Sequence, residues 1–216
     1  MDSTPFIDNF NRLIGKSCLF ADTVEEGIGS LPDKTERQKV SILLVRAALS
    51  HYRAIPLLLA DDIYLTSALA LARCVMDASF RAIWSAQLAT DDDLSEAWNG
   101  RKKWPPPPKV ANHFEIKLSQ LPNEIDVIQQ LWGHLSGFVH SGPVELQKIR
   151  RINHQDRLDR VRASIVTSSS LFLNYGACLT ATAAKGLAIA KHIDGEFEAL
   201  YRLGETLIQE PNVTVH

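Results

Sequence analysis

The stretch that decides the fold is Ile63–Ala89, which reads IYLTSALALARCVMDASFRAIWSAQLA. Its apolar residues recur at the spacing of an α-helix and give it one broad apolar face. Asp61 or Asp62, just before the stretch, is of a type that caps helix N-termini. The spacing predicts a long helix over 63–89 that buries one face, made of Leu65, Leu69, Ala72, Met76, Phe80, Ile83 and Leu88.

The rest of the chain shows the same helical period, and no run alternates at the spacing of a strand. A first helix is expected over Thr4–Ile28. A second should begin at Pro32-Asp33 and end or kink near Ile55, because Pro56 cannot donate a backbone hydrogen bond. Further helices are expected over 110–120, 124–139, 157–193 and 195–209, with short helices in 91–104 and between 143 and 151.

These patterns predict an all-α fold, a single bundle of five or six main helices with short connecting helices. Residues 1–216 should form one domain, with an N-terminal helix in 1–30 and a C-terminal helix and tail in 194–216. Residues 100–109 should be a proline-rich connector, since Pro105–Pro108 favours an extended polyproline spacer over a helix. Asp194-Gly195 should break the chain between the last two helices.

Composition narrows the classes of function. The net charge of −2 and the pI near 6.4 argue against a wholly basic nucleic-acid-binding protein. Cys18, Cys74 and Cys178 lie far apart in the sequence, which suits the reducing cytosol and argues against disulfides or a metal centre. We therefore expect a cytoplasmic protein without a bound metal or cofactor. Its four tryptophans lack the spacing of an aromatic cage and are expected to pack in the core.

We expect a protein that does not enter membranes, although one span is long enough to do so. No charged residue occurs from Ala163 through Ala184, a length that would cross a bilayer. The span is rich in Ser and Thr, whereas a bilayer span would be richer in Leu, Ile and Phe. We interpret it as the buried central helix of the bundle.

The candidate site is in LWGHLSGFVHSGPVELQKIRR, residues 131–151. An apolar helix there leads to His140 and then to a Ser-Gly-Pro turn, so that a polar side chain is mounted at the end of a rigid element. Ser136 and His140 are four residues apart and share one helix face. Ser136 and His140 are therefore the candidate site residues of this segment.

Charged residues on two other segments are candidate binding residues. Arg73, Asp77 and Arg81 repeat at i, i+4 and i+8 on an apolar helix, so Arg73 and Asp77 should be partly buried and paired. Arg150 and Arg151 belong to a basic edge just after His140, which would suit a phosphate. Besides these two arginines the edge contains Lys148, Arg157, Arg160 and Arg162, offset by Asp156 and Asp159.

LSGFVHSG resembles the motif that closes a core helix in HEPN bundles, the higher-eukaryote and prokaryote nucleotide-binding domains. ALARCVMDASFRAIW likewise resembles a helix of bacterial families related to HEPN and abortive-infection proteins. The resemblance implies a cytoplasmic homodimer that binds RNA or a nucleotide, in a toxin or phage-defence setting with an antitoxin-type protein partner. It also implies metal-independent ribonuclease activity, for which the candidate catalytic residues would be His140, His134 and Ser136. His140 is at the family's histidine position, His134 is where the family has arginine, and Ser136 is where it often has a polar residue.

Simpler interpretations stay open for each of these residues. His140 could instead cap its own helix, since histidine is favourable near a helix C-terminus. Arg73 and Asp77 could form a purely structural ion pair, and the basic edge could be a solvated helix face. The alternative function is accordingly a non-catalytic helical scaffold or partner-binding module. A small-molecule sensor with a pocket between the helices is a third.

Overall fold

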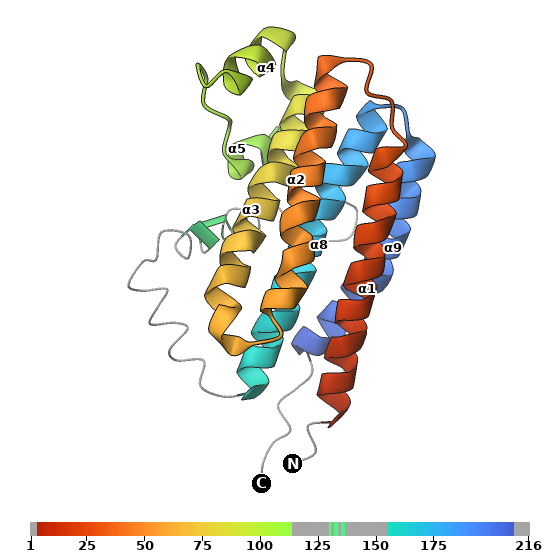
Figure 1. The fold of residues 1–216 in the computed structure, drawn as a ribbon, viewed down its shortest axis with the longest axis vertical. Coiled ribbons are helices and arrows are strands. Elements are labelled where there is room, and N and C mark those ends of the chain that lie inside the picture. The colour runs from red at the N-terminus through yellow and green to blue at the C-terminus, as the bar shows by residue number, and fades with distance from the viewer. Residues whose placement is uncertain (1–3, 114–129, 131, 134, 137–154, 210–216) are drawn as a thin grey trace.

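The protein is a bundle of long, roughly parallel and antiparallel helices, with no strand in the part of the chain that is described (Figure 1). The structure is a computed structural model that describes residues 4–113, 130, 132, 133, 135, 136 and 155–209. The predicted all-α fold is confirmed. The long helices are α1 (Thr4–Gly29), α2 (Glu36–Leu58), α3 (Leu65–Ile83), α8 (Gln155–Ala183) and α9 (Leu187–Gln209), and the short ones are α4 (Asp91–Trp98) and α5 (Pro107–Ala111).

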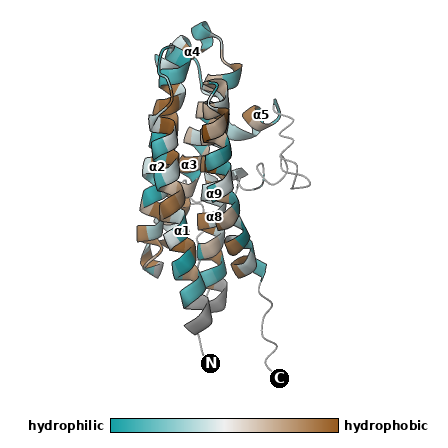
Figure 2. Cartoon of the chain, turned by 90° about the vertical axis from the view of Figure 1, so that its right-hand side faces the viewer, coloured by the Kyte–Doolittle hydropathy of each residue, from teal (hydrophilic) through white to brown (hydrophobic). Residues whose placement is uncertain are grey.

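The core lies around α8, which packs against α1, α2, α3 and α9. The uncharged span of this helix is buried, as predicted, and its small side chains allow close approach. A Cβ on Gly176 would come within 2.9 Å of Ser79 on α3. Figure 2 shows that the surrounding helices carry both hydrophobic and hydrophilic faces. None of the described helices has the length and apolar character needed to cross a membrane.

Helix α2 starts and ends differently from the sequence prediction. Thr35, rather than Pro32-Asp33, precedes its first turn, in a capping box in which the Thr35 hydroxyl accepts from Gln38 N and the Gln38 side chain accepts from Thr35 N. The helix then continues through Pro56 to Leu58. Pro56 lies in the last turn, where its missing N–H removes one backbone hydrogen bond, while the bond that caps the helix, from Leu59 N to Ile55 O, is kept at 3.0 Å.

Helix α3 confirms the predicted apolar helix but is shorter than 63–89, and Leu88, which was expected on its buried face, lies beyond it and is exposed. A 3₁₀ turn over Asp62–Tyr64 precedes it, and the Asp61 side chain accepts from Ile63 N at 3.1 Å. A π-helical turn over Trp84–Leu88 follows it. This wider turn ends where Ala89 N donates to Trp84 O at 2.9 Å, and it re-aims the chain toward α4.

The boundary between α8 and α9 corrects the prediction of one helix over 157–193 with a break at Asp194-Gly195. The break is at Lys185, whose φ of 65° is left-handed, and Gly186 N donates back to Ala181 O at 2.8 Å. Gly195 instead lies exposed inside α9. One exposed glycine costs a helix only about 1 kcal/mol, which packing of the apolar face of α9 outweighs.

The proline-rich connector is extended only in part. Pro106 is extended, with φ −68° and ψ 151°, but Pro107 and Pro108 form the first turn of α5, which corrects the expected polyproline spacer. Proline fits a first helical turn because its missing N–H would have no partner there. Before it, Trp104 packs edge-to-face on Trp84 in a small second cluster, which also contains Val40, Leu44, Ala89 and Leu94.

Candidate functional site

The centre of the candidate site is the pair Arg73–Asp77 on one face of α3. Arg73 Nη1 lies against Asp77 Oδ1, one helical turn further on. The side chains are 11% and 28% exposed. The contact is an ion pair between adjacent turns of the helix. The predicted partly buried pair is confirmed.

A distant segment of the chain completes the surroundings of Arg73. Its Nε donates to Ser136 Oγ at 3.0 Å, and its guanidinium lies over the Trp132 ring, 4.8 Å from the centroid. Ser136 Oγ in turn donates to Trp132 O at 2.6 Å. The serine hydroxyl therefore both accepts and donates, so its proton is not free for chemistry in this arrangement. The Trp132 indole N–H is buried without an acceptor among the described residues.

Cys74 adds a titratable group beside this pair. Burial raises the pKa of its thiol, and the Asp77 carboxylate raises it further, while Arg73 and Arg81 lower it. A thiol with a raised pKa is a poor nucleophile at neutral pH. We therefore assign Cys74 no catalytic role; its thiol pKa reports the local charge.

The structure brings together only part of the predicted site. Arg73, Asp77 and Ser136 meet in one cluster. The other candidate residues lie outside the described residues: His134, His140, Arg150 and Arg151. Within the predicted basic edge, Arg162 is only 14% exposed and pairs with Asp159 at 3.1 Å. Arg162 therefore forms an ion pair that stabilises its own helix, α8.

Two contacts of α3 were missed by sequence reasoning. Trp132 lies under Arg73, and Trp104 lies under Arg81, with 5.7 Å from its Cζ to the ring centroid. Both contacts join positions far apart in the sequence, so helical spacing carried no signal for them. Trp98 contradicts the expectation that all four tryptophans pack in the core, because it is 57% exposed on the short helix α4.

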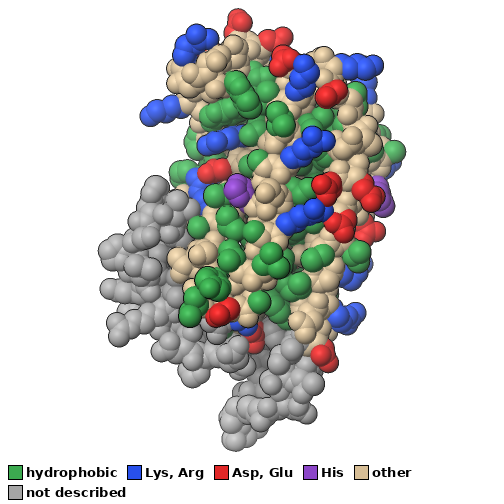
Figure 3. All heavy atoms as spheres, in the orientation of Figure 1, with side chains coloured by type: hydrophobic (Ala, Val, Ile, Leu, Met, Phe, Trp, Pro, Cys, Tyr) green, Lys and Arg blue, Asp and Glu red, His purple; other side chains and the backbone are tan. Residues whose placement is uncertain are grey.

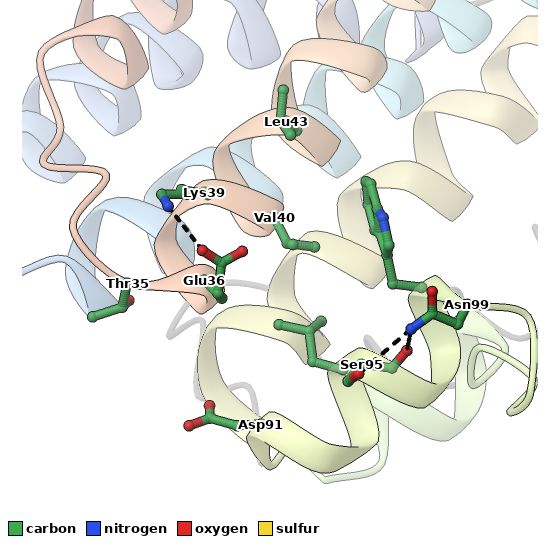
Figure 4. Close-up of a pocket in the computed structure, with 10 residues that line it drawn as sticks. Thr35, Glu36, Lys39, Val40, Leu43, Asp91, Ser95 and Asn99 are labelled. Carbon is green, nitrogen blue, oxygen red and sulfur yellow. Dashed lines mark hydrogen bonds and ion pairs between the residues drawn. The ribbon is translucent and has the colours of Figure 1, made fainter.

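A groove lies away from this cluster, between the start of α2 and α4 (Figure 4). Its volume is about 460 Å³. Val40 and Leu43 line it from α2. Ser95 of α4 and Asn99, the C-cap of that helix, lie opposite, and the Asn99 side chain donates to Ser95 O at 2.8 Å. The exposed Trp98 also lines this groove. No group of residues in the described ranges has the composition of a metal site.

Comparison with known proteins places the chain in a family. Residues 45–202 match DUF6988, described as a family of unknown function. The chain belongs to DUF6988. The match includes α3, α8 and the segment of Trp132 and Ser136, so the Arg73 cluster lies wholly inside the DUF6988 region. No curated protein and no solved structure matches the chain.

Proposed function

We propose that this DUF6988 protein is an HEPN-like protein that binds RNA or a nucleotide through phosphate contacts, with metal-independent RNA cleavage as its candidate reaction. The observation that carries the proposal is the bond from Arg73 to Ser136. It joins the two stretches that resemble HEPN-type proteins, which are 63 residues apart at this contact. Ser136 precedes His140 by four positions in the sequence, so the cluster on α3 anchors the segment that leads to the candidate acid/base.

The geometry assigns positioning roles rather than ligand contacts to the described residues. Arg73 is mostly buried and already holds Asp77, Trp132 and Ser136. A guanidinium committed in this way orients a helix better than it binds an incoming phosphate. The phosphate contacts are therefore assigned to Arg150 and Arg151, and the proton transfers to His140 with His134.

Cleavage of RNA by such a site would need no metal. The 2′-hydroxyl would lose its proton to one imidazole while its oxygen attacks the adjacent phosphorus. The bond from phosphorus to the 5′-oxygen then breaks, and the leaving oxygen takes a proton from an imidazolium. The products are a 2′,3′-cyclic phosphate and a 5′-hydroxyl, and Arg150 and Arg151 would balance the charge of the phosphate.

The test uses purified wild type, His140→Ala and His113→Ala with labelled single-stranded RNA in the presence of a chelator. His113 is exposed at the end of α5 and is the matched control. We expect wild type and His113→Ala to cleave, and His140→Ala to bind RNA without cleaving. In cells, induction should arrest growth and degrade RNA only for the two cleaving forms. Binding without cleavage in all three forms would reduce the proposal to an RNA-binding protein, and no binding would overturn it.

A second candidate is a non-catalytic partner-binding module, such as one that docks an antitoxin-type protein. One observation favours it: Arg73 has both of its polar partners, Asp77 and Ser136, within the protein, as in a scaffold. Under this alternative Arg73→Met changes stability alone. Under the first proposal it also lowers RNA binding at a temperature where the variant is fully folded, because the anchored segment loses its position.

A further inference from the structure

The outer face of α2 carries an exposed apolar stripe. Leu43 and Leu57 are 49% and 77% exposed, and Ala47, Ser50 and Ala54 lie between them at helical spacing. Figure 3 shows hydrophobic side chains gathered over α2 and α3 on this side of the molecule. Contiguous exposed apolar surface is characteristic of protein contact sites.

The stripe is self-complementary when it is reversed. Leu43 and Leu57 are equally far from Ser50 in the sequence, and an alanine lies between Ser50 and each leucine. In an antiparallel pair of α2 helices related by a twofold axis beside Ser50, each Leu43 would meet the partner's Leu57. The small residues at the centre would let the two backbones approach closely. Such self-complementarity is what a twofold contact requires.

The charges beside the stripe fit the same pairing. Arg53 pairs with both Asp22 and Glu25 on α1, at 2.6 and 2.7 Å, so this group has an excess of one negative charge. Arg46 is exposed one turn from Ser50 and forms no ion pair with a described residue. A twofold axis in the contact plane keeps α1 of both copies on one side of α2. It therefore places Arg46 beside the partner's Asp22 and Glu25 and balances the charge.

The ends of the stripe also match. Ile63 and Tyr64, at the connection from α2 to α3, are 79% and 47% exposed. Reversal about Ser50 places this connection opposite the first turns of the other α2, where the groove contains Trp98. In Figure 1, α4 and α3 lie on the same side of α2, as this match requires. Most of the large exposed hydrophobic side chains of the described residues would then be covered at once.

We propose that two copies of this chain pair antiparallel through α2, with the twofold axis beside Ser50 and each α2–α3 connection over the groove of the other copy. The pairing is inferred from the exposed surfaces of α2, its connection to α3 and the groove beside α4, together with charges on α1 and α2. It does not depend on RNA binding, so either proposal can fail without the other.

The first experiment measures the mass of the full chain in solution over a wide range of concentration, for wild type, Leu57→Glu and Leu187→Glu. Leu187 is 57% exposed at the start of α9 and serves as the matched control. We expect a wild-type dimer, an unchanged control, and a dissociation constant raised about 100-fold by Leu57→Glu, because the contact would bury an unpaired charge. Thermal melting checks that each variant is folded.

The second experiment tests the register by disulfide formation in a Cys18→Ser background, since Cys18 is the exposed native thiol. Ser50→Cys should cross-link to itself across the axis. Leu43→Cys should cross-link only when it is mixed with Leu57→Cys, because two copies of position 43 would be about 21 Å apart at the helical rise of 1.5 Å per residue. A monomer at all concentrations, or a dimer indifferent to Leu57→Glu and without these cross-links, would overturn the proposal.

Discussion

Arg73 and Arg81 lie two turns apart on α3, and each lies over a tryptophan from a distant part of the chain. Arg73 also has a carboxylate and a hydroxyl as partners. Arg81 faces Trp104, which belongs to the small apolar cluster around Trp84. An arginine over a tryptophan thus serves a different purpose in each region. Arg73 joins a polar network that ties α3 to the segment of Trp132 and Ser136, whereas Arg81 covers the ring of Trp104 and holds the proline-rich connector against α3.

The largest difference in stability between the surroundings of Arg73 and those of Arg81 should come from removing a charge partner. Asp77→Ala leaves the mostly buried Arg73 guanidinium without its carboxylate and should lower the free energy of unfolding by about 3 kcal/mol. Arg81→Met removes only a cation–π contact at a partly exposed site and should cost about 1 kcal/mol or less. Urea unfolding of both variants measures the difference.

The double variant Arg73→Met with Asp77→Leu is the control for this prediction. It removes both charges and keeps the volume, so it should recover most of the loss. If Asp77→Ala and Arg81→Met lower the free energy of unfolding by the same amount, the polar network at Arg73 is no more stabilising than the contact of Arg81 with Trp104.

Replacing each arginine by lysine should give a smaller difference in the free energy of unfolding between the two regions. Lysine keeps the charge but lacks the planar fork that reaches Asp77 and Ser136 together. We expect Arg73→Lys to cost about 1.5 kcal/mol, from one charged hydrogen bond and the lost stacking on Trp132. Arg81→Lys should cost about 0.5 kcal/mol or less, because an ammonium can also lie over an aromatic face. Equal losses would mean that the fork geometry at Arg73 is unimportant.

Ser136→Ala probes the polar anchor itself. The substitution removes the acceptor for Arg73 Nε and the donor to Trp132 O, and should cost about 1 kcal/mol. Combined with Arg73→Met, it should add less than this amount, because the shared bond is already lost. Full additivity in this double-mutant cycle would show that the two side chains are energetically independent.

The smallest effect is on the thiol of Cys74, which lies between the two regions. Asp77 raises its pKa and both arginines lower it, so Asp77→Asn should lower that pKa and Arg81→Met should raise it. The pH dependence of thiol labelling in a Cys18→Ser background measures the shifts. Cys178 does not interfere, because burial raises its pKa to about 12. Shifts of the opposite sign would contradict the placement of these charges.

Local patterns in the sequence predicted the features that depend on local geometry. The helical period predicted α3 and its buried face, and the i, i+4 spacing predicted the pair of Arg73 and Asp77. The contact from Arg73 to Trp132 was not predictable, because it depends on how distant segments pack. Ser136 was selected for its place beside His140, and its bond to α3 came only with the fold.

The errors occurred where packing overrides local preference. Gly195 is a helix-weakening residue, yet the buried residues of α9 on either side keep it helical. Lys185 has no special preference for a left-handed backbone, yet it ends α8 because the chain must turn back against the bundle. Pro107 looked like a spacer, although proline is equally suited to starting a helix.

The hairpin of α2 and α3 has a consequence for how ligands would be held. Ser50 lies eight residues before the end of α2, and Arg73 lies eight residues after the start of α3, so they are at the same height in the antiparallel pair. In the proposed dimer, the rotation axis passes over α3 at this height, and the two Arg73 clusters flank it on one edge. A single flexible strand that reached both of the sites anchored by these clusters would bind with avidity, since its second contact would be intramolecular. The position of one serine relative to one arginine would thus set the valency of the protein.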